Sequence, residues 1–474
     1  MIDPRVPDAK LTASFRDPHG FVFKHDGEIY RQLNDSCRDN YDGFMQSGLY
    51  EVLVEKRFLV PHVEIDDGLL PGGKTYYKIL KPEQLQFISY PYEWSFSQLK
   101  DAALQTLRVQ ALSLEHGFVL KDASAYNVQF VDSHPIFIDT LSFVPYADGV
   151  PWVAYRQFCQ HFLAPLALMA YSDIGLSKLL VTNIDGIPLE LASKLLPVRT
   201  KFNYSLLAHI HLHARMQKNY ADAGEKSHHK PPKATKLSLP ALKALVASLH
   251  KATSGLKWNI PKTEWGNYYE NTNYSERATA SKKLLVDEFL SAIPESLNVI
   301  HDLGANSGDY SRVAATHCNV VVSQDIDPVA VEENYLRTGR GKPRNILPLI
   351  QDLFAPSPAI GWANTERDSF VDRGQCDAIL ALALIHHIAI SNNVPIGDIA
   401  RLFARLTRWL IIEFVPKSDS QVERLLRTRE DIFPNYHEKG FERAFSSEFT
   451  VIDKRTIDYS DRTLFLMKRN ASVV

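Results

Sequence analysis

Short apolar runs and helical apolar patterns alternate from about residue 265 to the C-terminus. Residues 275–293 predict a capped amphipathic helix, with Leu284, Leu285 and Phe289 on its apolar side. The apolar runs that follow have the length of strands and are separated by further helical patterns. The expected strands cover 297–303, 319–325, 345–351, 376–385 and 408–415. This alternation predicts a doubly wound, mainly parallel α/β sheet.

The end of the chain departs from this alternation. After a helix near 438–446, two strands at 449–456 and 463–468 are joined only by the segment DYSDR. So short a link permits only antiparallel pairing. We therefore expect a Rossmann-like, seven-stranded α/β sheet closed by a C-terminal antiparallel hairpin, with one reversed edge strand.

The whole chain predicts more than one domain, because 474 residues exceed what a single core holds. Residues 1–217 mix short strands with amphipathic helices and are expected to form an α+β domain. Residues 218–258 carry eight lysines and two acids without interleaved aromatic residues, which favours a solvated linker over a nucleic-acid patch. Within this linker, Ser238 and Pro240 begin a short helix that docks back onto one domain. Residues 259–474 form the doubly wound domain.

Composition and charge narrow the functional classes. The formal net charge of -2 supplies no strong field toward nucleic acid or an anionic membrane, so neither is an expected partner. The four cysteines have no CxxC spacing, so they indicate neither a disulfide framework nor a zinc site, and no metal is expected in the doubly wound domain. The most apolar stretch, 162–171, is half of a membrane span, and the N-terminus has no apolar signal region. We therefore expect a cytoplasmic protein.

The first strand of the doubly wound domain leads into the segment VIHDLGANSGDYS at 299–311. Asp302 ends the strand, and Gly304 and Gly308 bracket the turn into the next helix, where a ligand can lie against bare backbone. Asn306 holds the middle position of the dinucleotide pattern G-x-G-x-x-G, so that pattern is not met. A pyrophosphate needs close access to backbone N–H groups. S-adenosylmethionine has no phosphate and is better served by nearby carboxylates and carbonyls.

Acidic residues end the next two strands. Asp325 lies 21 residues beyond Gly304, which is the distance at which an acid meets a ribose diol in this topology. Asp327 directly precedes Pro328 and is expected to be the N-cap of the next helix. Asp352 ends the third strand, where its carboxylate can accept a hydrogen bond from an adenine amino group, and a loop or cap role for it stays open.

Four segments, in this order and spacing, resemble the motifs of class I S-adenosylmethionine-dependent methyltransferases: DLGANSG, SQDIDPVAV, QDLF and CDAILALALIHHIAI. NAD-binding domains usually lack the terminal hairpin, which class I methyltransferases have. The resemblance implies S-adenosyl-L-methionine as the cofactor, with Asp302 and Gly304 near its methionine part, Asp325 on the ribose and Asp352 near adenine. Asn306 departs from the family's middle glycine. The whole chain is similar to bacterial nodulation-type methyltransferases, which implies a carbohydrate or lipid-linked acceptor.

Two histidines are the candidates for acceptor chemistry. An oxygen acceptor must lose its proton, and an imidazole with a pKa near neutrality suits that task. His386 and His387 stand at the expected carboxyl end of the fourth strand, where open α/β sheets place ligands. Successive strand residues point to opposite faces, so at most one of the two faces the pocket. Either histidine could instead be a structural polar cap at the end of the strand, and this alternative stays open.

Further acceptor candidates surround this strand. Glu413, on the next strand, is a weaker candidate for contact with the acceptor. Tyr268, Tyr269 and Tyr274 precede the first core strand. These tyrosines either close over the cofactor and line an acceptor pocket, or pack a helix on the edge of the sheet.

The N-terminal half contains a second motif, in residues 118–143. Asp122 and Asn127 are five residues apart, and Asp139 follows a short strand. This spacing resembles the catalytic loop of protein kinases and aminoglycoside phosphotransferases, which implies a kinase-like domain that binds Mg²⁺ and ATP. One residue departs from the pattern of these kinases: the first hairpin has Arg31 where they have a phosphate-binding lysine. An unrelated scaffold, a kinase-like fold without activity and an active phosphotransferase all stay open.

The function expected from these motifs is S-adenosylmethionine-dependent methyl transfer to a small-molecule or glycan acceptor, with O-methylation favoured. Two alternatives remain. One is a bifunctional phosphotransferase and methyltransferase, and the other is a non-catalytic scaffold that retains both folds.

Overall fold

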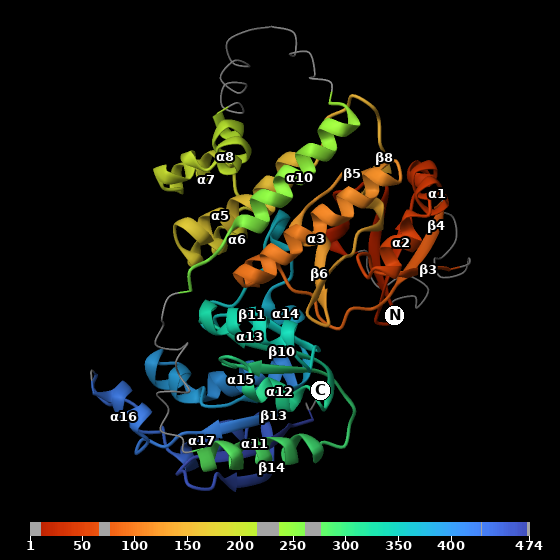
Figure 1. Cartoon of the computed structure of the whole chain (residues 1–474). Helices are drawn as coiled ribbons and strands as arrows, with labels where there is room; N and C mark the ends of the chain where they lie inside the picture. The colour runs from red at the N-terminus through yellow and green to blue at the C-terminus, as the bar shows by residue number, and fades with distance from the viewer. Residues whose placement is uncertain (1–10, 66–75, 216–236, 261–275, 428, 472–474) are drawn as a thin grey trace.

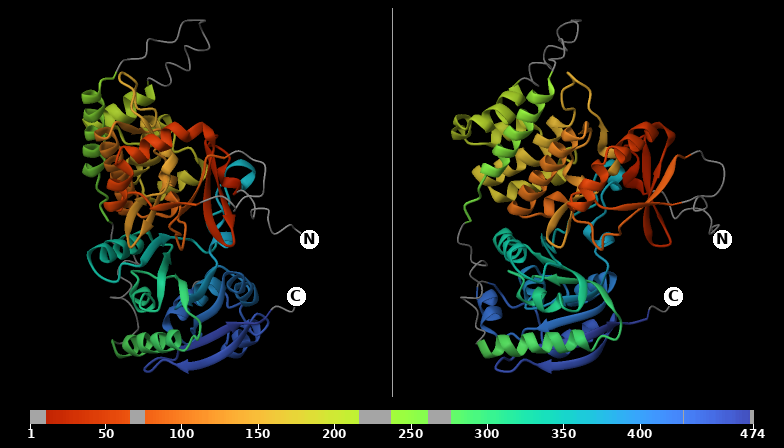
Figure 2. Two further views of the ribbon diagram at one scale, coloured as in Figure 1. Left: turned by 90° about the vertical axis from the view of Figure 1, so that its right-hand side faces the viewer. Right: turned by 45° about the vertical axis from the view of Figure 1, so that its right-hand side comes forward.

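The computed structural model describes residues 11–65, 76–215, 237–260, 276–427 and 429–471. Two halves stack on each other. The N-terminal half ends with α10 (Leu239–Gly255), and the C-terminal half begins with α11 (Glu276–Ser291). Figure 1 shows the N-terminal half above the C-terminal half, and Figure 2 shows the same stacking from two further directions.

The C-terminal half contains the predicted seven-stranded sheet, in the order β11-β10-β9-β12-β13-β15-β14. Its strands are β9 (Leu297–Leu303), β10 (Cys318–Asp325), β11 (Ile346–Ile350), β12 (Cys376–Ala381), β13 (Thr407–Phe414), β14 (Phe449–Thr456) and β15 (Thr463–Arg469). Strands β9 to β13 pair in parallel, and β15 is antiparallel to both β13 and β14. The Rossmann-like α/β fold with its C-terminal hairpin is confirmed. The prediction of a reversed edge strand is wrong in one detail. The reversed strand, β15, lies between β13 and β14, so β14 forms the edge of the sheet.

Helices connect these strands. Besides α11 they are α12 (Asp309–Ala314), α13 (Pro328–Arg340), η11 (Trp362–Asn364), α14 (Phe370–Arg373), η12 (His387–Ser391), α15 (Ile396–Leu406), α16 (Ser420–Leu426) and α17 (Glu438–Phe445). In α15, Ile399, Ala400 and Phe403 are buried on one face, which is the pattern of a helix that covers a sheet.

Two helix predictions can be compared with the structure. Asp327 caps α13 as predicted, because its Oδ1 accepts a hydrogen bond from the Val329 N–H at 2.9 Å. The prediction for α11 needs correction at Leu284, whose side chain is 59% exposed. The buried side of that helix is formed instead by residues that include Val286 and Phe289.

The N-terminal half combines antiparallel strands with helices. Its main sheet has the order β1-β2-β4-β3, and two smaller pairs are β5–β8 and β6–β7. The strands are β1 (Gly20–His25), β2 (Glu28–Leu33), β3 (His62–Ile65), β4 (Lys78–Pro82), β5 (Phe118–Leu120), β6 (Val128–Val131), β7 (His134–Phe137) and β8 (Phe143–Pro145). The α-helices are α1 (Arg38–Gln46), α2 (Leu49–Glu55), α3 (Phe96–Glu115), α4 (Tyr155–Phe158), α5 (Ala164–Tyr171), α6 (Leu179–Thr182), α7 (Leu189–Leu195), α8 (Tyr204–Leu206) and α10. Shorter helical turns are η1 (Thr12–Ser14), η2 (Asp35–Cys37), η3 (Pro91–Glu93), η4 (Ala125–Asn127), η5 (Thr140–Ser142), η6 (Cys159–Leu163), η7 (Ile174–Lys178), η8 (Val198–Phe202) and η9 (Leu207–Leu212).

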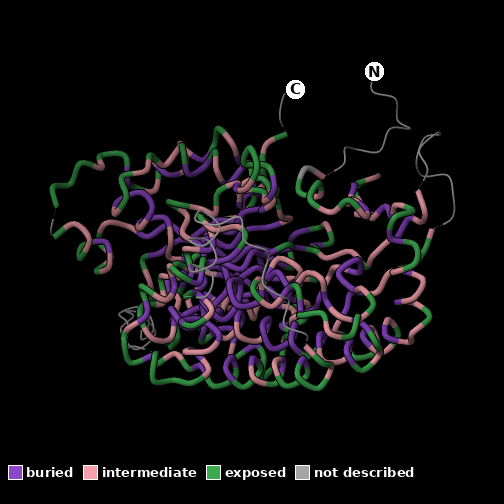
Figure 3. The backbone as a smooth tube through the Cα atoms, turned by 90° about the horizontal axis from the view of Figure 1, so that it is seen from above, coloured by how far each residue is buried: buried purple, intermediate pink, exposed green. Residues whose placement is uncertain are grey.

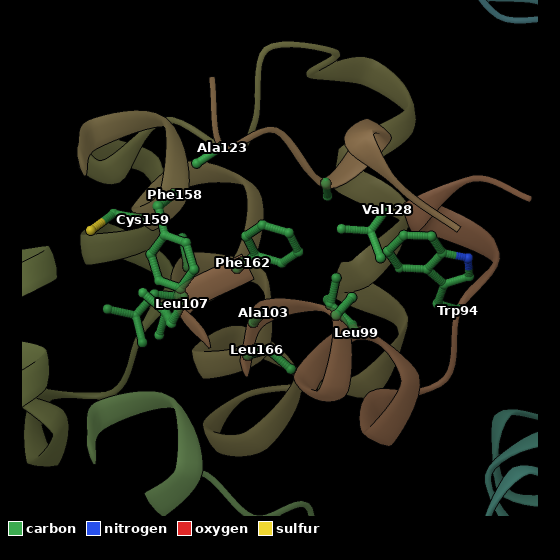
Figure 4. Close-up of a cluster of buried hydrophobic side chains, with 14 of the residues drawn as sticks. Trp94, Leu99, Ala103, Leu107, Ala123, Val128, Phe158, Cys159, Phe162 and Leu166 are labelled. Atoms are coloured by element: carbon green, nitrogen blue, oxygen red, sulfur yellow. The ribbon is translucent and has the colours of Figure 1, made fainter. Parts of the chain in front are cut away.

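The core of this half forms around α3. The helix begins after its N-cap Ser95 and carries Leu99 into a fully buried cluster with Phe158 and Phe162 (Figure 4). The apolar run 162–171 belongs to this core, which explains its hydrophobicity. Over the described ranges, no helix is long and apolar enough to cross a membrane.

The helix α10 packs on α3 and so belongs to the N-terminal half. Leu242 and Leu249 are fully buried in the same core. The Lys100 ammonium on α3 donates to the carbonyls of Ser254 and Leu256 at 2.8 Å each. The helix expected within residues 218–258 therefore docks as predicted, and the first part of that segment, to residue 236, lies outside the described residues.

One buried apolar cluster joins the two halves. Val299, Val322 and Leu347 on strands β9 to β11 belong to the same cluster as Trp94 and Leu99 of the N-terminal half. The connection from β11 to β12 contains only the four-residue α14 as an α-helix, and η3 packs against β11. Figure 3 shows that buried residues gather at the centre of the molecule, while exposed residues form its rim. The N-terminal half thus covers sheet surface that crossover helices cover in other doubly wound folds.

A buried ion pair crosses the same junction. Glu93 in η3 is 1% exposed, and its carboxylate pairs with the guanidinium of Arg373 in α14. The same carboxylate accepts hydrogen bonds from the Ser357 hydroxyl at 2.7 Å and from the Tyr90 N–H at 2.8 Å. Glu93 therefore connects the two halves through a fully hydrogen-bonded charge.

We expect Glu93→Ala to lower the free energy of unfolding by about 3 kcal/mol, because it leaves the buried Arg373 guanidinium without its partner. Chemical denaturation of the full chain measures this change. Glu83→Ala is the matched control, since Glu83 is exposed, and it should change stability by less than about 0.5 kcal/mol. Equal, small changes in the two variants would contradict the prediction.

Candidate active site

A cavity of about 380 Å³ lies at the carboxyl edge of the parallel strands. The chain order of the strands reverses here, because β10 lies on one side of β9 and β12 on the other. Open α/β sheets bind ligands in such a crevice. Six residues singled out in the sequence line the cavity: Asp302, Gly304, Asn306, Asp325, Asp352 and His387.

The loop after β9 needs left-handed backbone at three positions. Gly304, Asn306 and Gly308 have φ values of +72°, +50° and +80°. Asparagine tolerates this region better than most residues do, which explains how Asn306 replaces a glycine. A Cβ on Gly308 would lie 2.4 Å from the Asn334 side chain. Gly308, predicted to contact the cofactor, is not among the residues that line the cavity, and it packs closely against Asn334.

The backbone N–H groups of this loop are already used inside the protein. Ala305 donates to the carbonyl of Gln324 at 2.9 Å, and Gly308 donates to the carbonyl of Ala305 at 2.9 Å. Asn306 donates to the carboxylate of Asp325 at 2.8 Å, and Ser307 donates to the Asn306 side chain at 2.8 Å. A pyrophosphate would need these donors. The loop is therefore built for a ligand that presents hydroxyl or amino groups to carboxylates.

Two carboxylates face the cavity from neighbouring strands. Asp325 accepts hydrogen bonds from the N–H groups of Asn306 and Asp327, at 2.8 and 2.9 Å, which fix its orientation. Asp302 accepts one from the Ser311 hydroxyl at 2.6 Å. Burial raises the pKa of each carboxyl group to about 6. A cation or a hydrogen-bond donor in the cavity would stabilise their ionised forms.

Lys282 is a site residue that the sequence reasoning missed. It lies on the buried side of α11, lines the cavity, and is 3% exposed. Its ammonium donates to Glu413 at 2.6 Å, and Glu413 also accepts from the Ala383 N–H at 2.6 Å and pairs with Arg462. Glu413, predicted to contact the acceptor, is fully buried and is not among the residues that line the cavity. The sequence contained one signal for this position, because Lys282 lies at helical spacing from Val286 and Phe289 and so falls on the buried side of the helix.

The two histidines lie in a helical turn and not on the strand. Strand β12 ends at Ala381, four residues before the predicted end at 385. His387 lines the cavity, whereas His386 is fully buried outside the lining, with the two ring centroids 4.2 Å apart. Burial lowers the pKa of His387 to about 4, and it also lowers the pKa of His386 well below its ordinary value. His387 is therefore uncharged at neutral pH. Of the two candidate histidines, His387 lines the cavity and His386 does not.

The remaining candidates divide between the cavity and the part of the chain that is not described. Asp352 lines the cavity after β11, and its carboxylate accepts from the Phe354 N–H at 2.8 Å. Tyr268, Tyr269 and Tyr274 lie outside the described residues. An aromatic residue that was not predicted, Tyr310, lines the cavity with its ring centroid 4.6 Å from the Lys282 ammonium.

The second motif forms a compact polar cluster in the N-terminal half. Asp139 pairs with Arg31 of β2 and accepts a hydrogen bond from Ser142. Asn127 donates to the Ser142 hydroxyl at 3.5 Å and also bonds to Asp122. Burial raises the pKa of Asp122, and the charge of Asp139 adds to this shift. Within the described residues, no group of three or more His, Cys, Asp or Glu side chains is arranged to hold a metal ion.

Comparison with known proteins identifies a relative over nearly the whole chain. No family model matches it. The nodulation protein NoeA of Rhizobium meliloti (strain 1021) is 37% identical over 485 residues, which cover 98% of this chain and 99% of that protein. The chain belongs to the NoeA family. The resemblance to nodulation proteins is therefore confirmed, and it extends over both halves of the chain.

Among solved structures, several methyltransferases match this chain with low similarity. NodS, an N-methyltransferase from Bradyrhizobium japonicum WM9 in complex with S-adenosyl-L-homocysteine, covers 44% of this chain and 99% of its own, with 12% identity and a TM-score of 0.31. Magnesium protoporphyrin IX methyltransferase from Synechocystis PCC 6803 covers 44% and 92%, with 17% identity and a TM-score of 0.30. The bifunctional kinase-methyltransferase WbdD covers 43% and 41%, with 15% identity and a TM-score of 0.30. These TM-scores are too low to assign the fold. The fold assignment therefore depends on the observed strand order of the sheet.

Proposed function

We propose that the chain is an S-adenosylmethionine-dependent methyltransferase. One observation carries the proposal: the loop after β9 uses its N–H groups internally and orients the Asp325 carboxylate into the cavity. That arrangement suits a ribose diol and disfavours a pyrophosphate. The 380 Å³ cavity is within the range that holds a small-molecule ligand. The cofactor supplies an electrophilic methyl group on a sulfonium when it is bound.

In this proposal, different residues around the cavity bind different parts of the cofactor. Asp325 accepts from the ribose hydroxyls, and Asp352 accepts from the adenine amino group. Asp302 faces the cationic amino group of the methionine part, and Gly304 leaves space where a side chain would approach Leu384. Lys282, held by Glu413, supplies a positive charge for the methionine carboxylate.

The acceptor side of the cavity contains His387, Ser391 and Asn392. The Ser391 hydroxyl is buried and has no hydrogen-bond partner within the described part of the chain. These groups suit a hydroxyl on a small molecule or a glycan. The attacking hydroxyl becomes strongly acidic as its oxygen gains the methyl group, so the uncharged His387 ring accepts the proton despite its lowered pKa, which makes O-methylation the proposed reaction.

The experiment that tests this function is calorimetric titration of S-adenosylhomocysteine into the full chain. We expect saturable binding at one site with a Kd near the micromolar range, about -8 kcal/mol. Folded protein that shows no binding would overturn the proposed function.

We expect His387→Ala to reduce kcat by about 100-fold, because the acceptor hydroxyl loses the group that takes its proton. The affinity for S-adenosylhomocysteine should stay within about twofold. Transfer of labelled methyl groups to a screen of glycan acceptors measures the change. His250→Ala, at an exposed position, is the matched control. A His387→Ala enzyme with full kcat would remove His387 from the mechanism.

We expect the affinity for S-adenosylhomocysteine to be constant above about pH 7 and to fall below about pH 6. Burial raises the pKa of Asp302 and Asp325 to about 6, so both protonate as the pH falls through that value. A protonated carboxyl group loses its attraction for the cationic amino group and part of its accepting capacity. Each group should contribute up to about a tenfold loss per pH unit. Titrations from pH 5 to pH 8 measure this, and a flat profile would contradict it.

Phosphotransfer is the second candidate activity, because Asp122, Asn127 and Asp139 form one polar cluster. These residues lie in the single segment 118–143, where Asn127 bonds to Asp122 and to Ser142, and Ser142 also bonds to Asp139. The pairing of Asp139 with Arg31 engages a carboxylate that a magnesium ion would need, which favours a domain without catalysis. Magnesium-dependent ATP hydrolysis that is lost in Asp139→Ala would establish the bifunctional alternative. Its absence in the folded protein would support a non-catalytic half.

A further inference from the structure

A second cavity, of about 560 Å³, lies at the junction of the two halves. It shares no lining residue with the candidate active site. Its walls come from the end of α2, from α3, from the β6–β7 hairpin and from the last turns of α13. Figure 1 shows α3 and β6 directly above α13, and α3 and α13 are in contact. Both halves are therefore needed to form this junction cleft.

The junction cleft has a strong excess of positive charge. Four basic side chains line it, and all four are exposed: Lys56, Arg57, Arg108 and Arg340. The lining contains one carboxylate, that of Asp101. This excess stands out because the whole chain has a formal net charge of only -2.

Few of these charges are neutralised by the protein itself. Arg57 pairs with Asp132 at 2.9 Å, and among the ion pairs of the described residues it is the only one of the four cations that takes part. The Asp101 carboxylate already accepts a hydrogen bond from the Tyr335 hydroxyl at 2.8 Å, and burial raises its pKa. Cations that converge on one hollow from separate elements repel one another until an anion binds between them.

A buried amide adds an independent observation. Gln105 lines the cleft and is only 2% exposed, and its Nε2 donor has no hydrogen-bond partner within the described ranges. Buried donors are nearly always satisfied, so an unused one points to a ligand or an ordered water. Phe58, Ile136 and Leu336 supply apolar wall beside the cations.

We propose that the junction cleft binds a small oligophosphate, an anion that carries at least two phosphoryl groups. A single phosphate contacts only adjacent donors, whereas an extended anion can meet cations from α2, α3 and α13 together. The apolar wall accommodates an organic part of such a molecule. Because the ligand contacts both halves, its binding stabilises their junction.

The test titrates inorganic tripolyphosphate and inorganic phosphate into the full chain in the presence of EDTA. EDTA removes metal-dependent binding at the Asp139 cluster, and the cleft requires no metal. We expect tripolyphosphate to bind at one site, to raise Tm and to weaken with added salt. Phosphate should bind at least tenfold more weakly. The affinity for S-adenosylhomocysteine reports separately on the proposed methyltransferase site.

The double variant Arg108→Gln with Arg340→Gln should weaken tripolyphosphate binding at least tenfold without changing the Tm of the free protein. Arg215→Gln with Arg427→Gln is the matched control, since both positions are exposed and lie outside the cleft. Equal losses in the two double variants would show a non-specific charge effect and would overturn the proposal. Folded protein that binds no tripolyphosphate, or binds phosphate equally well, would also overturn it.

Discussion

Replacing Asp325 by alanine should weaken the binding of S-adenosylhomocysteine by about 100-fold. Hydrogen bonds to an ionised carboxylate contribute about 1.5–3 kcal/mol each, and a ribose diol makes two of them. A loss of about 3 kcal/mol corresponds to roughly 100-fold in Kd. The substitution also leaves the N–H groups of Asn306 and Asp327 without their acceptor, so the loop loses its fixed geometry. Calorimetric titration of the folded variant measures the effect.

Two further variants separate the ribose contact from changes in folding. Asp325→Asn keeps the shape and one acceptor oxygen, so it should retain an intermediate affinity. Asp327→Ala removes the cap of α13, which costs about 1 kcal/mol of stability and should leave the affinity within about twofold. If Asp325→Ala binds as tightly as the original protein, the ribose assignment is wrong, whatever ligand the cavity holds.

Local spacing predicts the part of the site that belongs to single βα units. Asp302, Asp325 and Asp352 each end a strand, and parallel strands bring their carboxyl ends to one edge of the sheet. Their positions in the cavity follow from the order of the elements alone. The same local logic predicts the cap at Asp327 and the terminal hairpin, because both depend on residues that are close in the sequence.

Contacts between distant segments are beyond such reasoning. Glu413 was a weaker candidate for contact with the acceptor, but Lys282, 131 residues earlier, donates to it and makes it a buried support. The choice between His386 and His387 depended on whether β12 extends to residue 385. The strand ends at Ala381, and the helical turn that follows presents His387 to the cavity. A shift of four residues in one boundary therefore decides which of the two side chains lines the cavity.

The junction between the halves was the least predictable feature. Strands β9 to β11 are apolar, and such strands can be covered by their own crossover helices or by another domain. Their sequence does not distinguish the two arrangements. Only the three-dimensional structure shows that Val299 and Val322 share a cluster with Trp94 and Leu99. The sequence reasoning therefore separated the chain into units joined by a linker, whereas the structure makes the N-terminal half part of the support of the sheet.

The separated C-terminal half, residues 259–474, should consequently fail to fold cooperatively. Without the N-terminal half, Val299, Val322, Leu347 and Leu349 on the sheet face lose their covering. Exposing each such side chain costs about 1.5–3 kcal/mol, so four of them remove about as much as the typical net stability of a domain. The buried Arg373 also loses Glu93, which adds an uncompensated charge.

Circular dichroism and thermal unfolding of the purified fragment measure this prediction, and the full chain is the reference. We expect no cooperative transition for the fragment, together with exposed apolar surface that binds a reporter dye. Co-expression with residues 1–258 should restore cooperative folding and the binding of S-adenosylhomocysteine, because it restores the shared cluster without a covalent link. A fragment that unfolds with the Tm of the full chain would show that the sheet face is stable when uncovered. In that case the N-terminal half would be retained for a function of its own, and the polar cluster at Asp139 and the junction cleft would be the sites to test.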